Sequence, residues 1–218
     1  MLQRDRSGLG FAVGKEPLPS ALAAHGVEVL GTDLGSDEAG WSLSDEYARS
    51  ADHLFHPALV DQETFKRNVR FAPADMRDLC EFSTESFDFV WSSCSFEHLG
   101  SLQAGFKFVT EAMRLIKPGG VAVHTTEFNV ASNTETWESG GSVIYRKMDI
   151  ETLDYMLRRN GAALESVDFN PGAHLHDIDY DYPPYFTHGR KHVKLLLGPH
   201  ISTSILLIIQ KGNSPPNE

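Results

Sequence analysis

The sequence is poor in cysteine, in positive charge and in long apolar runs. Only two of its 218 residues are cysteine, and neither Cys80 nor Cys94 has the spacing of a metal site or a disulfide framework. We therefore expect a reducing compartment and no metal site. The longest strongly apolar run, residues 205–210, is far too short to cross a bilayer, and the first residues lack the apolar core of a signal peptide. The sequence thus predicts a cytoplasmic protein without a membrane partner.

Positively charged residues are also few in this sequence. Lys and Arg number 19 against 30 Asp and Glu, which gives a formal net charge of −11. Nucleic-acid binding relies on clustered basic side chains that displace counterions, so a nucleic-acid partner is disfavoured, although residues 188–194 form a local basic stretch. A small-molecule substrate is the expectation, and the sequence leaves the oligomeric state open.

What the sequence does contain is an alternation of apolar runs and helix-like stretches. This pattern is typical of βαβ units with a mostly parallel sheet, and the length fits one domain over residues 1–218. Strands are predicted at 8–11, 27–33, 69–75, 87–93, 121–128, 164–170 and 200–212. Helices are predicted at 18–25, within 101–120, and at 149–162 with Asp149 as N-cap; 34–53 reads as loop plus short helix and 171–199 as a long structured loop.

In an open α/β sheet, ligands bind beyond the carboxyl ends of the strands, so the residues that follow each strand are the first candidates. After the first strand, Gly10, Ala12 and Gly14 in "GFAVG" allow a ligand to approach the backbone closely. An ordinary tight turn is the alternative. Asp33, followed by Leu34, ends the second strand 19 residues after Gly14, where a carboxylate accepts the hydroxyl hydrogens of a ribose. A turn cap is the alternative role of Asp33.

The third and fourth strands end in further candidate residues. Asp75 can accept the exocyclic amine of adenine while Met76 packs on the ring, unless Asp75 is simply a solvated turn residue. Ser93 leaves room beside a ligand at the end of the fourth strand. Glu97 and His98 then bring an acid and a base to the cleft, with His98 able to deprotonate a hydroxyl. Alternatively, Glu97 caps the next helix and His98 only packs.

The fifth strand ends in "HTTEFN", which offers Glu127 as a substrate-facing group. His124 is expected to be buried and hydrogen-bonded rather than reactive. Tyr145 and Arg146 either line the mouth of the site or belong to a solvated loop. Cys94 is not favoured as a nucleophile, because no partner base is identifiable.

Taken together, these motifs resemble the class I S-adenosylmethionine-dependent methyltransferases, in particular the small-molecule group of the methyltransferase type 11 kind. The matching pieces are "GFAVG", "VLGTD", "ADMRDLCEFSTESFDFVWSSCSFEHL" and "EAMRLIKPGGVAVHTTE", which cover residues 8 to 128. The resemblance implies a Rossmann-like, doubly wound seven-stranded sheet, mostly parallel with an antiparallel last strand and helices on both faces. It also implies S-adenosylmethionine as cofactor, with its methionine part near Gly10 to Gly14, its ribose on Asp33 and its adenine beside Asp75 and Met76.

The function expected from this resemblance is methyl transfer to an oxygen or nitrogen of a small polar acceptor. His98 is the predicted base, and Glu97 or Glu127 the orienting group. The fragments "EPLPSALAAHG", "VWSSCSFEHLGSL" and "HTTEFN" also look like a bacterial subgroup associated with glycan-modifying enzymes, which suggests a glycan-related acceptor. Ala12 departs from the family's middle glycine, and most of the helical segment that usually precedes the first strand is not in the sequence.

Two rival functions use the same features. A nicotinamide-dependent oxidoreductase also has a glycine loop and a distal acid, but the "KPGG" turn before residues 121–128 and the final run "ISTSILLIIQ" suit an antiparallel hairpin rather than a second mononucleotide-binding half. A non-catalytic binding or scaffold protein with this fold is the second rival. Cofactor binding and turnover separate the three functions.

Overall fold

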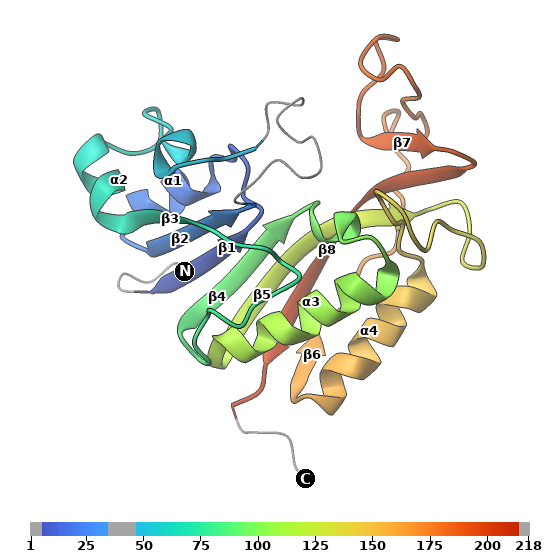
Figure 1. Ribbon diagram of the computed structural model, residues 1–218. Coiled ribbons are helices and arrows are strands. Elements are labelled where there is room, and N and C mark those ends of the chain that lie inside the picture. Colours follow the sequence, from blue (N-terminus) through green and yellow to red (C-terminus); the bar gives the residue numbers. More distant parts are fainter. Residues whose placement is uncertain (1–5, 35–46, 214–218) are drawn as a thin grey trace.

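The computed structural model describes residues 6–34 and 47–213, which form one twisted sheet flanked by helices (Figure 1). The strands within these residues are β1 (Ser7–Phe11), β2 (Glu28–Asp33), β3 (Val69–Pro73), β4 (Phe87–Ser93), β5 (Ile116–Asn129), β6 (Ala162–Leu164), β7 (Lys194–Leu197) and β8 (His200–Lys211). The sheet order is β3-β2-β1-β4-β5-β8-β6, and β7 pairs with β8 off this path. The first five strands are parallel, whereas β8 runs antiparallel to β5, β6 and β7.

Helices lie on both faces of the sheet. They are α1 (Leu18–Ala24), α2 (Gln62–Asn68), α3 (Leu102–Leu115) and α4 (Lys147–Arg159), with short 3-10 turns at Ala51–Leu54 and Phe96–His98. Helix α3 begins after Ser101, whose side-chain oxygen accepts a hydrogen bond from the backbone N–H of Ala104 over 3.1 Å. Figure 1 shows α3 and α4 side by side over the half of the sheet that contains β4, β5 and β8, whereas α1 and α2 cover the β1–β3 half.

Alternation along the strands divides the apolar residues between two cores. On β4, Val90 belongs to the core that α3 and α4 complete, while its neighbour Trp91 belongs to the core beneath α1 and α2. Gly10 on β1 makes room for Trp91, since a Cβ there would lie 2.3 Å from Cζ2 of the indole. Both faces of the central strands are therefore buried, as a doubly wound sheet requires.

The doubly wound α/β prediction and the antiparallel last strand are confirmed, but some elements differ from the sequence-based expectation. The sixth strand covers Ala162–Leu164 rather than 164–170, and the predicted loop 171–199 contains β7, an eighth strand among the described residues. Helix α2 was not predicted. Asp149 is not the N-cap of α4; it is the third helical residue and accepts a hydrogen bond from the backbone N–H of Arg146 over 2.8 Å. The short helix predicted within 34–53 corresponds to Ala51–Leu54, and residues 35–46 lie outside the described residues.

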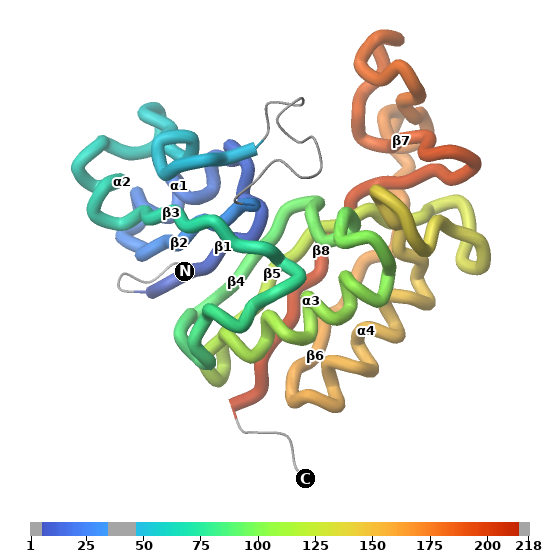
Figure 2. The backbone as a smooth tube through the Cα atoms, viewed as in Figure 1, coloured from blue at the N-terminus to red at the C-terminus, as the bar shows by residue number. Residues whose placement is uncertain are grey.

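Figure 2 shows the path of the chain between β6 and β8, which extends beyond the sheet and passes through β7. Pairing with Ser202 and Thr203 fixes β7 against β8, so this segment is anchored at the edge where the carboxyl end of β5 lies. Among the described residues, no helix combines the length and the apolar character needed to span a membrane.

Candidate active site

A cavity of about 920 Å³ opens at the carboxyl ends of the parallel strands. This volume lies within the range of small-molecule and cofactor sites, and its place beside β1 and β4, where the strand order reverses, is the usual ligand site of such sheets. Its lining residues come from the ends of all five parallel strands and from the segment before β7. They are Ala12, Val13, Gly14, Lys15, Glu16, Asp33, Leu34, Tyr47, Ala74, Asp75, Met76, Arg77, Ser93, Cys94, Ser95, His98, Leu99, Gly100, Glu127 and His192.

The loop after β1 turns sharply under this cavity. Ala12 and Gly14 both have positive φ, 47° and 52°, a backbone conformation that glycine adopts easily and alanine does not. Ala12 and Gly14 line the cavity as predicted, whereas Gly10 is buried beneath the loop against Trp91. The sequence thus predicted the loop, and the structure assigns Gly10 a packing role instead of a lining role.

Asp33 joins this loop to the end of β2. Its carboxylate accepts backbone N–H bonds from Gly14 (3.1 Å), Leu34 (2.9 Å) and Ala48 (3.1 Å). Burial raises the pKa of Asp33, and these three donors oppose the rise. A carboxylate has about four acceptor positions, so one lone pair of Asp33 remains for a ligand hydroxyl. Leu34 lines the cavity beside it, and its carbonyl accepts the hydroxyl hydrogen of Tyr47.

Asp75 and Met76 lie together on the wall that follows β3. Met76 is buried, and Asp75 pairs with Arg77, whose Nη2 lies 2.6 Å from Oδ2. The side-chain hydrogen bonds from Arg77 hold the pKa of Asp75 below its usual value, so the carboxylate stays ionised. A flat base could therefore contact the Met76 thioether while the Asp75 oxygens accept a hydrogen from its amine.

Glu16 was not among the residues predicted from the sequence. Its Oε1 accepts the indole N–H of Trp91 over 2.6 Å, and its Oε2 accepts the hydroxyl of Ser93 over 3.0 Å. Burial raises the pKa of Glu16, and these two hydrogen bonds lower it. The signal for Glu16 in the sequence was an acidic residue shortly after the glycine loop. Its orientation depends on Trp91, 75 residues away along the chain, which local pattern does not reveal.

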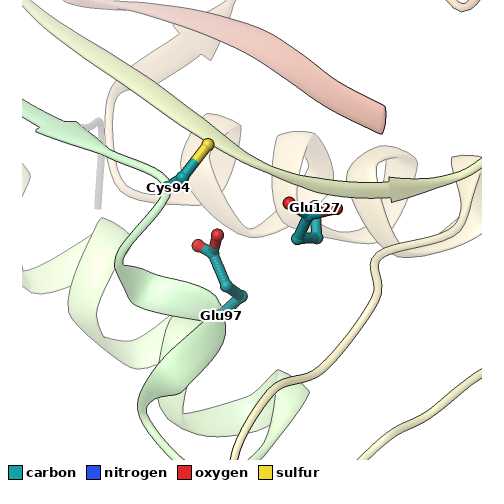
Figure 3. Close-up of side chains that lie close together, drawn as sticks. All are labelled: Cys94, Glu97 and Glu127. Carbon is teal, nitrogen blue, oxygen red and sulfur yellow. The ribbon is translucent and has the colours of Figure 1, made fainter. Parts of the chain in front are cut away.

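Three side chains cluster where β4 and β5 end (Figure 3). The sulfur of Cys94 and carboxylate oxygens of Glu97 and Glu127 lie within 4.8 Å of one another. Glu97 is 1% exposed, accepts the hydroxyl of Thr126 over 3.0 Å, and does not line the cavity; burial raises its pKa to about 8. Glu127 lines the cavity and accepts the hydroxyl of Ser202.

The environment of this cluster disfavours a thiolate nucleophile. Burial and the nearby Glu97 raise the pKa of the Cys94 thiol, whereas a reactive cysteine needs a lowered pKa. Of the three side chains, Cys94 and Glu127 line the cavity and Glu97 lies beneath it.

His98 lies at the cavity wall, as predicted, and its Nδ1 donates to the carbonyl oxygen of Gly141 over 2.9 Å. Ser101, not Glu97, caps α3, so the capping alternative for Glu97 is wrong. His124 is fully buried, with its Nδ1 2.8 Å from Ser92 Oγ, which confirms the expectation that it is a core residue. Burial lowers the pKa of His124 to about 3.

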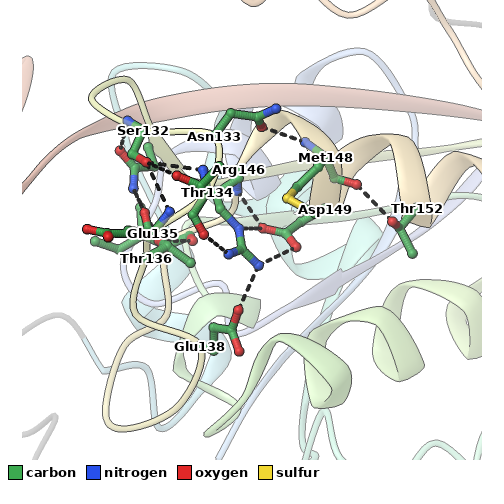
Figure 4. Close-up of polar contacts among 12 residues, drawn as sticks. Ser132, Asn133, Thr134, Glu135, Thr136, Glu138, Arg146, Met148, Asp149 and Thr152 are labelled. Atoms are coloured by element: carbon green, nitrogen blue, oxygen red, sulfur yellow. Dashed lines mark hydrogen bonds and ion pairs between the residues drawn. The ribbon is translucent and has the colours of Figure 1, made fainter.

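Tyr145 and Arg146 are buried away from the cavity rather than at its mouth. Figure 4 shows the Arg146 guanidinium fixing the loop before α4: it contacts Asp149, Glu138 and the carbonyl oxygen of Thr134. Both suggestions for these residues, the mouth of the site or a solvated loop, are wrong, because both residues are buried and these three partners hold Arg146 inside the fold.

His192 is a second cavity residue that the sequence did not predict. It reaches the cavity from the segment before β7, and its ring contacts Phe186 and Tyr185. The segment reads as an aperiodic loop, so no local pattern points to this position. The cavity is thus lined by the carboxyl groups of Glu16, Asp33, Asp75 and Glu127 and by the imidazoles of His98 and His192, which suits a ligand that carries positive charge and hydroxyl groups.

Comparison with known proteins yields one family and many structures of the same fold. Residues 9–124 match the model of a family described as a methyltransferase domain. A methyltransferase from Methanosarcina mazei has 16% identity and a TM-score of 0.57 over 97% of this chain and 95% of that chain. One from Mesorhizobium loti has 14% identity and a TM-score of 0.57, with coverage of 97% and 93%.

The cyclase SpnF has 14% identity and a TM-score of 0.64, with coverage of 98% of this chain and 78% of its own. No curated protein sequence matches the chain significantly. At these low sequence identities, the structural matches establish the fold of the chain but not its reaction. SpnF is an example, because it has the same fold and is a cyclase. The reaction therefore follows from the family and from the residues of the site.

Proposed function

The chain belongs to the class I S-adenosylmethionine-dependent methyltransferases, whose methyltransferase domain matches residues 9–124, and on this basis we propose that it methylates an oxygen or nitrogen of a small polar acceptor. Its cofactor is S-adenosylmethionine. The observation that carries the proposal is the 920 Å³ cavity at the carboxyl ends of β1 to β5, with carboxylates on both sides. Membership in this family is compatible with either oxygen or nitrogen as the acceptor atom.

The residues present fit this cofactor. We propose that the backbone of Ala12 and Gly14 faces its methionine part, that Asp33 and Leu34 hold its ribose, and that Asp75 and Met76 contact its adenine. The open lone pair of Asp33 supports the ribose contact, since its other three positions accept backbone N–H groups. Ser93 and Glu16 complete this wall, and the Glu16 carboxylate suits the positive charge of the cofactor.

When bound, the cofactor supplies a methyl group already activated by its positively charged sulfur. The chain therefore has to align the acceptor atom with that methyl group and exclude water. We propose that Glu127 and His98 contact the acceptor, while Glu97, neutral and buried, supports Thr126 from beneath the cavity. His98 was predicted as the base, and a hydroxyl acceptor needs one whereas many amines do not.

A glycan-related acceptor is the narrower proposal. Sugars present several hydroxyl groups to polar side chains and one face to aromatic rings. Glu127, His98 and His192 supply polar groups at the cavity, and the rings of Tyr185 and Phe186 contact His192. This combination supports a polyhydroxylated acceptor over an apolar one.

The rival oxidoreductase function has less support from the fold. The last strand, β8, runs antiparallel between β5 and β6, where a dinucleotide-binding sheet has a further parallel strand. The scaffold alternative predicts binding without turnover.

The test is co-purification followed by an acceptor screen. Mass spectrometry of the purified protein is expected to find S-adenosylmethionine or S-adenosylhomocysteine, and a screen of small alcohols, sugars and amines is expected to find acceptor-dependent S-adenosylhomocysteine. Binding without any turnover would favour the scaffold, and binding of NADH in place of both compounds would favour the oxidoreductase.

A further inference from the structure

The segment between β6 and β8 holds a carboxylate–imidazole pair at the edge of the cavity. Asp181 is fully buried, and its Oδ2 lies 3.0 Å from Nδ1 of His192. The backbone of Asp181 is fixed to β7 in both directions: its N–H donates to Lys194 and its carbonyl accepts from Leu196, each over 2.8 Å. Asp181 is therefore held in place within an otherwise irregular segment, and its carboxylate orients the imidazole of His192.

The partners of Asp181 determine the tautomer of His192. Its carboxylate also accepts the backbone N–H groups of Tyr182 (3.0 Å) and Phe186 (2.9 Å). The hydrogen bond from Phe186, followed by that from His192, lowers the pKa of Asp181, so the group is an ionised acceptor. Nδ1 of His192 must therefore carry the hydrogen, which leaves the lone pair on Nε2.

The His192 ring is held from its face as well. Phe186 stacks on it with ring centroids 4.0 Å apart, and Tyr185 meets it edge-on at 5.4 Å. Phe186 adopts a φ of 62°, which is unfavourable for a bulky residue and brings its N–H to Asp181 and its ring to His192. Nε2 has no hydrogen-bond partner among the described residues, and His192 lines the cavity.

His98, the base predicted from the sequence, also lines the cavity. Its Nδ1 donates to a neutral carbonyl oxygen, that of Gly141, whereas Nδ1 of His192 donates to a carboxylate. Both contacts fix a tautomer, but a buried carboxylate also stabilises the imidazolium that forms after proton transfer. Resting on the proposed function, we infer that His192 is the base for a hydroxyl acceptor and that Asp181 is its positioning residue.

The step balances without a further reactant. Nε2 of His192 takes the hydroxyl hydrogen of the acceptor as the acceptor oxygen forms a bond to the methyl carbon and the carbon–sulfur bond of the cofactor breaks. The products are the methyl ether, S-adenosylhomocysteine and the His192 imidazolium, which then releases its proton to solvent. Asp181 keeps its negative charge throughout.

The first test needs no acceptor. Diethyl pyrocarbonate modifies unprotonated imidazole nitrogens, and peptide mass spectrometry reports each histidine separately. We expect modification of His192 to slow at least about threefold when S-adenosylhomocysteine fills the cavity. His188, which stacks on Tyr182 in the same segment and does not line the cavity, is the internal reference and should react at an unchanged rate. Equal rates for His192 with and without S-adenosylhomocysteine would overturn the inference.

The second test uses the hydroxyl compound with the highest turnover in the acceptor screen. His192→Asn keeps an N–H for Asp181 and removes the base, so kcat is expected to fall about 10²- to 10⁴-fold. Asp181→Asn should lower kcat by a smaller factor with the acceptor KM unchanged, and Asp181→Glu should restore part of it. His188→Asn is the matched control and should retain wild-type kcat.

A measurement of cofactor binding distinguishes a failure of the proposed function from a failure of the assignment of His192 as the base. Calorimetry with S-adenosylhomocysteine should give the same affinity for wild type and His192→Asn, because His192 is assigned to the acceptor. Wild-type turnover in His192→Asn together with a large loss in His98→Asn would overturn the inference and return the role to His98. Acceptors that are all amines, unaffected by His192→Asn, would overturn it as well. No binding by wild type would overturn the proposed function and this inference with it.

Discussion

The backbone N–H of Gly14 donates a hydrogen bond to Oδ2 of Asp33 over 3.1 Å, so the loop after β1 and the end of β2 are directly joined. This contact brings together two elements that the sequence separates by 19 residues. It also leaves the two groups expected to hold the methionine part and the ribose on one continuous wall of the cavity. The following predictions test that wall and the cluster opposite it.

Asp33→Ala should bind S-adenosylhomocysteine at least about tenfold more weakly than wild type. The reason is that a hydrogen bond to a charged group contributes about 1.5–3 kcal/mol, and the variant loses the proposed ribose contact and the link to Gly14. Titration calorimetry measures the affinity. Asp61→Ala is the control, because Asp61 also accepts a backbone N–H, that of Thr64, at the start of α2. It should lose helix-cap stability without losing affinity; equal affinity of Asp33→Ala and wild type would refute the ribose assignment.

Ala12→Gly should bind S-adenosylhomocysteine more tightly and unfold at a higher temperature. A left-handed alanine costs about 1–2 kcal/mol, and the greater chain entropy of glycine offsets about 0.5–1 kcal/mol of the gain. Thermal unfolding and calorimetry give the two quantities. Glu85, with φ of 53° in a turn outside the cavity, provides the control: Glu85→Gly should raise stability and leave affinity unchanged. A loss of affinity in Ala12→Gly would contradict the close approach at this loop.

Glu16→Gln should weaken S-adenosylmethionine binding by about tenfold, and S-adenosylhomocysteine binding by less. Both ligands carry an ammonium group, but only the former has a positive sulfur, and Gln keeps the shape of Glu16 while removing its charge. The indole of Trp91 and the hydroxyl of Ser93 hold the side chain in place in the wild type. Glu111 on α3, which is half-buried and does not line the cavity, supplies the control variant Glu111→Gln. Unchanged affinities for both ligands would show that Glu16 has only a structural role.

Glu97→Gln should become progressively more stable than wild type as pH rises. Burial raises the folded-state pKa of Glu97 to about 8 from 4.5, so between these values the unfolded chain has released a proton that the folded chain retains. The folded state therefore loses stability with rising pH across this window, and the loss ends above about pH 8. Gln imitates the protonated acid and keeps the acceptor for Thr126. Urea unfolding at pH 5, 7 and 9 measures the difference; parallel curves for the two proteins would contradict the neutral assignment.

Local pattern predicted much of the fold and part of the site. Strand β4 has a near-continuous apolar run, and Gly14, Asp33, Asp75 and Met76 lie at a strand end or shortly after one, so their order along the chain was enough to place them at one cavity. Strand β7 was missed because Lys194–Leu197 is four residues long and depends on pairing with β8, not on an apolar repeat of its own. Helix α2 was missed because its sequence "QETFKRN" buries little more than Phe65.

The unpredicted site residues depend on contacts distant in sequence. Glu16 is oriented by Trp91 on the neighbouring strand, and His192 by Asp181 through a segment without periodicity. For Arg146 the sequence left the mouth of the site and a solvated loop open, and both are wrong, because its guanidinium pairs with Glu138 and Asp149 and is buried. Residue type and spacing do not reveal such partners, because the contacts form only when distant parts of the chain come together in the fold.

Transfer of a labelled methyl group tests the central claim most directly. The protein is incubated with S-adenosylmethionine that carries a ¹³C-methyl group and with a mixture of small sugars, alcohols and amines, and mass spectrometry follows the products. We predict a labelled methylated product, an equal amount of S-adenosylhomocysteine, and a rate at subsaturating cofactor that falls at least about tenfold in Asp33→Ala. No labelled product with the wild type, or equal rates for wild type and Asp33→Ala, would contradict the proposal that this cavity transfers methyl groups.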